Sequence, residues 1–160
     1  MQNTIEKALN DLHLKYMTVV ENDHQIVFKL GMTLENGRTD SFIDVRKKDN
    51  QVLIYAVCPT NIPPAQRARI AEFITRANYC LILGNFEMDF NDGELRFKLA
   101  YNYDDTFPPS EEVFKKSFFT SLNMLDRYLP GIMSVVYANC NPANAIMQIE
   151  NASSQNPTLN

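Results

Sequence analysis

The sequence predicts an α+β fold, in which helices pack on an antiparallel sheet made of a three-stranded meander and a hairpin. Segments that alternate apolar and polar residues are joined by short turn sequences, as antiparallel strands are. Other segments repeat apolar residues every three or four positions, as amphipathic helices do. These segments follow one another in the order helix, meander, helix, hairpin and C-terminal helices.

The first predicted element is a short amphipathic helix. Asn3 or Thr4 can cap it, and apolar residues recur at helical spacing at Ile5, Ala8, Leu9 and Leu12. A brief strand over residues 16–20 is expected to follow.

The meander is predicted from two turn sequences. Residues 25–35 form a strand that ends at Asn36-Gly37, a pair that favours a two-residue turn because both residues tolerate positive φ. This turn would place Leu30 opposite Ile43 and Lys29 opposite Asp44. A second turn at Asp49-Asn50 leads into a third strand over residues 51–58.

The third strand is apolar on both of its faces. One face points to the helices, and the other belongs to a group of five apolar residues: Val27, Phe42, Leu53, Tyr55 and Val57. Such a strand is either covered by structure on both sides or part of an association surface. We favour a surface for a protein partner, either a second copy of the chain in a homodimer or another protein.

A proline-led helix and a hairpin come next. Pro63 or Pro64 suits the first turn of a helix that runs to about Tyr79 and buries Ile70, Phe73, Ile74 and Ala77. A two-residue turn at Asp92-Gly93 would then pair Glu87 with Lys98, Asp89 with Arg96 and Phe90 with Leu95. The acidic residues of this hairpin are therefore interpreted as cross-strand ion-pair partners.

The C-terminal part is predicted to be helical. Ser110, followed by Glu111 and Glu112, is a favourable helix start, and a stripe follows at Phe114, Phe118, Leu122, Leu125 and Leu129. This helix should stop at Pro130-Gly131 and restart over residues 132–137. Asn141-Pro142 opens a last helix that ends near Glu150.

Length and composition favour one domain over residues 1–150 with a disordered polar tail at 151–160. A chain of 160 residues can bury one core but is too short to expect two. It has neither a signal-like start nor an apolar run near the ~18 residues of a membrane span, so we expect a cytoplasmic protein without a membrane partner. A net charge of −4 disfavours nucleic acid.

Catalytic and metal motifs are missing from the sequence. There is no G-x-S-x-G, no C-x-x-C and no glycine cluster for phosphate, and "DFNDGE" does not complete a calcium loop. Cys58 would need His13 or His24 beside it to act as a nucleophile, so it is interpreted as a core thiol, like Cys80 and Cys140. We expect no catalytic residue, no cofactor and no metal.

The segment "VCPTNIPPAQRARIAEFITRANYCLILGNFEMDFNDGELRFKLAY" adds a resemblance. With its proline-led helix, Asn78, Gly84-Asn85-Phe86, Asp89 and Gly93, the chain resembles the YbjN-like family, also labelled putative bacterial sensory transduction regulators, over roughly Asn3 to Glu150. The resemblance implies a fold like that of type III secretion chaperones and no established catalytic residues.

Two functions follow as hypotheses. The first is a non-enzymatic protein-binding module of chaperone or regulator type. The alternative is a small-ligand or cation-binding protein, or an enzyme, that uses the acidic loop with Asp104, Asp105, Glu111 and Glu112. A charged helix start and a solvated loop explain these acids more simply.

Overall fold

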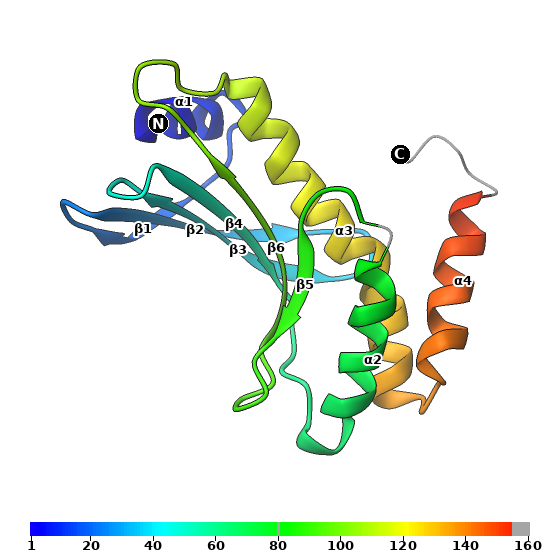
Figure 1. Cartoon of the computed structure of the whole chain (residues 1–160). Helices are drawn as coiled ribbons and strands as arrows, with labels where there is room; N and C mark the ends of the chain where they lie inside the picture. The colour runs from blue at the N-terminus through cyan, green and yellow to red at the C-terminus, as the bar shows by residue number, and fades with distance from the viewer. Residues whose placement is uncertain (80, 155–160) are drawn as a thin grey trace.

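The computed structural model of the chain describes residues 1–79 and 81–154, and in it helices pack on one antiparallel sheet (Figure 1). The sheet has six strands in the order β1-β2-β3-β4-β6-β5. The elements are α1 Gln2–Asp11, β1 Met17–Glu21, β2 Gln25–Thr33, β3 Arg38–Arg46, β4 Gln51–Val57, a 3₁₀ turn η1 Pro64–Gln66, α2 Arg67–Asn78, β5 Asn85–Met88, β6 Leu95–Asn102, α3 Glu111–Tyr137 and α4 Pro142–Ser154. The predicted α+β fold class is confirmed.

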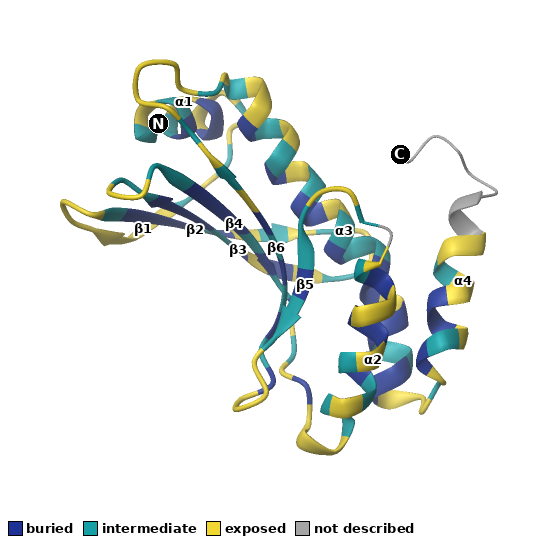
Figure 2. Ribbon diagram, viewed as in Figure 1, coloured by how far each residue is buried: buried dark blue, intermediate teal, exposed yellow. Residues whose placement is uncertain are grey.

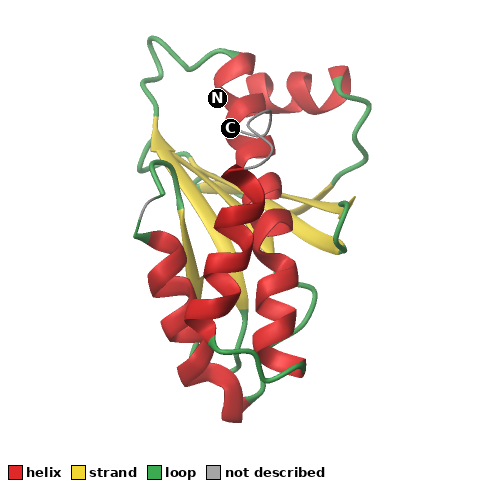
Figure 3. Ribbon diagram, turned by 90° about the vertical axis from the view of Figure 1, so that its right-hand side faces the viewer, coloured by secondary structure: helices red, strands yellow, loops and turns green. Residues whose placement is uncertain are grey.

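All four α-helices lie on the same side of the sheet (Figures 1 and 3). The buried residues concentrate between the sheet and this helical layer (Figure 2). The predicted stripe of α2 is buried there, and so is the whole predicted stripe of α3 from Phe114 to Leu129. Within residues 1–79 and 81–154 the opposite face of the sheet carries no helix, and we call it the open sheet face.

The three predicted hairpin registers are wrong by two residues. The last strand pairs before the turns are Thr33 with Arg38, Arg46 with Gln51, and Met88 with Leu95. Leu30 therefore lies opposite Ser41 instead of Ile43. Because side chains alternate between faces with a period of two, a shift of two leaves every residue on its predicted face.

A contact with α3 explains the register of the first hairpin. The backbone N–H groups of Glu35 and Asn36 donate to the Asp126 carboxylate at 3.2 and 2.8 Å. Neither Asn36 nor Gly37 adopts a positive φ. Gly37 instead lies close to α3, since a Cβ there would lie 2.8 Å from Leu129 Cδ2.

The third hairpin turns through a longer loop than predicted. Gly93 has φ +83°, and the carboxylates of Asp89 and Asp92 accept hydrogen bonds from the N–H groups of Asn91 and Glu94 at 2.7 and 2.8 Å. Asp89 thus caps the turn and does not pair with Arg96. Phe90 is exposed and does not lie opposite Leu95.

Helix α3 continues through Pro130, so the predicted break at Pro130-Gly131 is wrong. Proline has no N–H, which leaves the carbonyl of Asp126, four residues earlier, without its helical donor. The side-chain amide of Asn36 donates to that carbonyl at 3.2 Å. Gly131 lets the neighbouring helix come close, because a Cβ there would lie 2.4 Å from Ile149 Cδ1.

Two of the three predicted helix caps are confirmed. The Ser110 hydroxyl accepts from the N–H of Val113, and the Asn141 side chain accepts from the N–H of Ala143 at 2.9 Å. Helix α1 begins one residue before Asn3, at Gln2, without a side-chain cap.

The C-terminal helix is longer than predicted. Helix α4 extends to Ser154, so the predicted disordered tail at 151–160 starts inside a helix, and residues 155–160 lie outside the described part.

Candidate protein-binding surface

The open sheet face brings the five predicted interface residues together. The strand pairing sets Phe42 beside Tyr55, and it sets Val27 and Leu53 on the two sides of Asp44. With Asp44, Glu94 and Arg96, four of the five line a shallow groove of about 230 Å³: Val27, Phe42, Tyr55 and Val57. Sequence alternation alone was enough to find this group, although its use as an interface stays a prediction.

Charged side chains from neighbouring strands lie over this apolar group. The guanidinium of Arg96 sits 4.4 Å from the centre of the Tyr55 ring, and Lys29 Nζ sits 5.5 Å from that of Phe42. Both are cation–π contacts. Long charged side chains can rest their apolar stems on such a surface while their heads stay in water. Val27 and Leu53 on the same face are only 9% exposed, although no helix of the described residues covers them.

Ion pairs hold these covering side chains in place. Arg96 contacts Glu87 at 2.6 Å and Glu94 at 3.0 Å, and Lys98 also binds Glu87. Lys29 pairs with Asp40 at 2.7 Å, and Arg46 pairs with Asp44 at 3.1 Å. The predicted contact of Glu87 with Lys98 is therefore present, but through a different register.

The electrostatics of the face follow from burial and these pairs. Burial opposes the ionisation of Glu87, but hydrogen bonds from Lys98 and Arg96 outweigh it and hold the pKa of Glu87 below its usual value. Burial raises the pKa of Tyr55, and the positive charges of Arg96 and Arg46 partly offset this rise. At neutral pH the face therefore carries paired charges around neutral aromatic rings.

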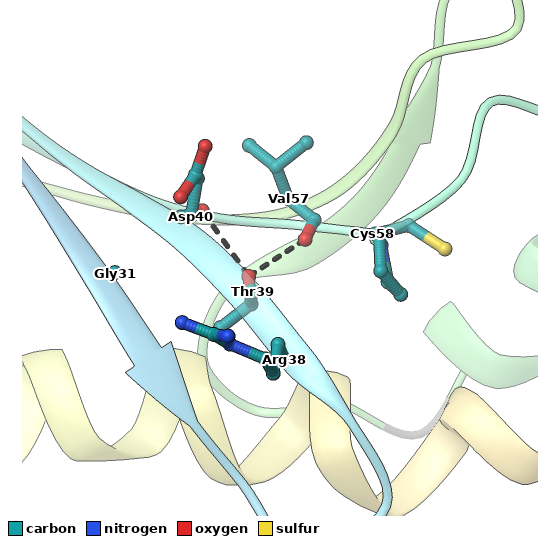
Figure 4. Close-up of a pocket in the computed structure, with 7 residues that line it drawn as sticks. Gly31, Arg38, Thr39, Asp40, Val57 and Cys58 are labelled. Atoms are coloured by element: carbon teal, nitrogen blue, oxygen red, sulfur yellow. Dashed lines mark hydrogen bonds between the residues drawn. The ribbon is translucent and has the colours of Figure 1, made fainter.

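A pocket of about 310 Å³ at one end of β3 and β4 contains Cys58 (Figure 4). The hydroxyl of Thr39 is engaged there, because it donates to the carbonyl of Val57 at 2.6 Å and lies 3.1 Å from that of Asp40. Burial raises the pKa of the Cys58 thiol to about 11, so the thiol stays protonated.

His24, one of the two histidines that could activate Cys58, lies far from it in the fold. His24 lies at the opposite end of the sheet, because Gln25 beside it pairs with Arg46 while Val57 pairs with Asp40. Cys140 is a free, half-buried thiol, and Cys80 lies outside the described residues. This geometry favours the structural interpretation of Cys58.

Two acids of the predicted acidic loop, Asp104 and Glu111, have separate local roles. Asp104 accepts from the N–H of Thr106 at 2.7 Å. Glu111 pairs with Lys7 of α1 and lies 3.7 Å from Lys115. Across residues 1–79 and 81–154, no three histidine, cysteine, aspartate or glutamate side chains gather as they would around a metal ion. Within the same residues, none of the helices has both the length and the apolar character needed to cross a bilayer.

Sequence reasoning missed a second exposed apolar surface. Four large apolar residues are exposed: Tyr79, Ile82 and Leu83 in the connection between α2 and β5, and Phe119 on α3. We call these four residues the loop surface. One sequence signal could have revealed the loop surface. It is the apolar run Leu81-Ile82-Leu83, which stands directly before Gly84 and outside any predicted helix or strand.

Comparison with known proteins relates the chain to one family. A sequence profile of the YbjN family, described as "Putative bacterial sensory transduction regulator", matches residues 2–133. A solved structure described as "Crystal structure of YbjN, a putative transcription regulator from E. coli" is similar with a TM-score of 0.56 at 17% identity, covering 87% of this chain and 91% of that one. The "HopA1-SchA Chaperone-Effector Complex" gives a TM-score of 0.48 at 12% identity, covering 79% and 89%. No curated protein matches the chain.

Proposed function

The chain belongs to the YbjN family, and from that premise we propose that it is a non-enzymatic protein-binding module of regulator or chaperone type. Its partner, a second copy or another protein of the cytoplasm, binds the open sheet face. The family description points to regulation, and the net charge of −4 favours a protein over nucleic acid as the partner.

One observation carries this proposal: within the described residues, charged side chains and no helix cover the apolar centre of the open sheet face. An apolar and aromatic centre inside a polar rim is the usual anatomy of a protein interface. Arg96 and Lys29 are surface side chains that can swing away from Tyr55 and Phe42 without unfolding a helix or strand. A partner could then contact the two aromatic rings and keep the ion pairs at its rim.

The alternative site, in the acidic loop, receives no support from the geometry. Asp104 binds a backbone N–H, and Glu111 binds lysine side chains. The open sheet face is therefore the better supported site.

The substitution Tyr55→Glu tests the proposal. It puts a carboxylate at the centre of the face, and we expect it to abolish association. Size-exclusion chromatography with light scattering measures the mass of the wild type and the variant. Affinity purification with mass spectrometry, using both as baits, detects a different protein partner.

Tyr137→Glu is the matched control, since Tyr137 is an exposed tyrosine at the end of α3. This control should keep the wild-type mass and the wild-type partners. A folded Tyr55→Glu chain that retains both would show that the open sheet face is not the binding surface.

A further inference from the structure

The connection between α2 and β5 exposes large apolar side chains to solvent. Tyr79 is 89% exposed, Ile82 is 95% exposed and Leu83 is 59% exposed. Scattered apolar residues are normal on a protein surface, but several within one short connection mark an interaction site.

Described residues at the two ends of this connection and at Leu81 contact the rest of the fold. The Asn78 side chain donates to the carbonyl of Phe86 at 2.9 Å and accepts from the N–H of Phe86 at 2.7 Å. Leu81 packs against the core. Gly84 has φ +74°, and a Cβ there would lie 2.7 Å from the carbonyl oxygen of Lys98.

Leu83 shares a groove with the outer side of α3. The groove has a volume of about 570 Å³, and its α3 residues are Glu112, Lys115, Lys116, Phe119, Thr120 and Asn123. From Glu112 to Asn123 these positions follow three turns of the helix, or roughly 16 Å at 1.5 Å per residue. The groove is therefore long enough for about three turns of a second helix.

The charge of the groove is basic on a chain that is acidic overall. Two lysines and one glutamate line it. Lys115 makes only long contacts with Glu111 and Glu112, at 3.7 and 3.9 Å. Lys116 is exposed and makes no ion pair with a described residue.

From these features we propose that the loop surface docks an amphipathic helix of a partner protein that carries carboxylates beside its apolar stripe. The apolar stripe would cover Ile82, Leu83 and Phe119, and the carboxylates would meet Lys116 and Lys115. Helix-in-groove binding suits this site better than strand addition, because the Asn78 side chain already occupies the outer backbone edge of β5 at Phe86. This surface is separate from the open sheet face.

Two fluorescein-labelled model peptides of about four helical turns test the proposal. Both carry the same leucine stripe, flanked by glutamates in one peptide and by lysines in the other. Fluorescence anisotropy with the full chain should show that the glutamate peptide binds at least about tenfold more tightly. Leu83→Asp should weaken this binding by at least about tenfold, and Lys116→Glu should reverse the preference between the peptides.

Matched controls separate the loop surface from the rest of the molecule. Met17→Asp changes an exposed apolar residue on β1, and Lys48→Glu reverses an exposed lysine in the turn before β4, so both should leave binding within about twofold. Tyr55→Glu should also retain the peptide, which distinguishes this proposal from the proposed function.

Three results of the peptide experiment would overturn the proposal. The glutamate peptide does not bind, or it binds no better than the lysine peptide, or its binding is unchanged by Leu83→Asp and Lys116→Glu. A fourth result comes from vesicles of phosphatidylcholine and phosphatidylglycerol. If the wild-type chain sediments with these vesicles and Leu83→Asp does not, the surface binds membranes and the proposal is overturned.

Discussion

Gly93 occupies a conformation and a space that no other residue can share. Its φ is +83°, and a Cβ would lie 2.2 Å from the carbonyl oxygen of Ile62. The two residues are also joined by a 2.8 Å hydrogen bond from the Ile62 N–H to the Gly93 carbonyl. Gly31, in β2, has neither constraint, because a Cβ there would have its nearest contact at 4.0 Å.

We therefore predict opposite effects for two glycine-to-alanine changes. Gly93→Ala combines left-handed strain with a backbone clash and should lower the free energy of unfolding by about 3 kcal/mol or more. Gly31→Ala should change it by less than about 1 kcal/mol and can raise it, because alanine loses less chain entropy in a strand. Urea titrations of the two variants measure the difference, and equal losses would contradict the prediction.

At the scale of elements, one contact joins the first β-hairpin to α3. Asn36 satisfies the Asp126 carbonyl that Pro130 leaves without a donor, and Asp126 in turn holds the backbone of Glu35 and Asn36. The hairpin register and the continuity of the helix thus depend on the same few groups.

This dependence predicts a coupling between Asn36 and Pro130. Asn36→Ala should lower the free energy of unfolding by about 1 kcal/mol, because it leaves the Asp126 carbonyl unsatisfied. In a Pro130→Ala background, the new N–H of residue 130 can bond to that carbonyl, so the same change should have a smaller effect. A double-mutant cycle by urea denaturation measures the coupling.

Asn10→Ala is the control for this cycle, since Asn10 is an exposed asparagine on α1. Its effect should be the same in both backgrounds. An effect of Asn36→Ala that is equally large with and without Pro130 would show that the amide does not replace the lost helical donor.

At the scale of the whole molecule, the two sides of the sheet are covered by different means. Helices bury one side, and paired charges cover the other. The ion pairs on the open sheet face depend on pH, because Glu87 has a pKa below its usual value and binds both Arg96 and Lys98.

Acid should therefore remove the contribution of Glu87 to stability. A carboxylate whose pKa is lowered by folding contributes stability above its unfolded pKa, near 4.5, and loses it as the pH falls through the folded value. We predict that Glu87→Gln is less stable than the wild type at neutral pH and that the difference narrows below about pH 4.5. Urea midpoints measured between neutral and acidic pH test this.

Glu35→Gln serves as the comparison, since the Glu35 side chain is exposed in the turn between β2 and β3. At neutral pH its difference from the wild type should be smaller than that of Glu87→Gln, because an exposed carboxylate without an ion pair contributes little to stability. A constant difference for Glu87→Gln would show that its ion pairs do not stabilise the fold.

The sequence by itself determined which face is buried in α2, in α3 and in the strands of the meander and the hairpin. Alternation in the strands and the three-to-four spacing in α2 and α3 predicted the core, and Ser110 and Asn141 marked the true helix starts. The same alternation collected the five residues of the open sheet face. These features are local, because each depends on residues within a few positions of one another.

Only the tertiary structure decided the strand register, the continuity of α3 and the cover of the open sheet face. A shift of two residues preserves the alternation, so the pattern cannot distinguish the two registers. For the first hairpin the choice came from Asp126, which lies about 90 residues beyond the turn whose backbone it binds. Likewise, Pro130 lacks the N–H that would bond to the Asp126 carbonyl within the helix. The side-chain amide of Asn36 bonds to that carbonyl instead, because the fold brings the first hairpin and α3 together.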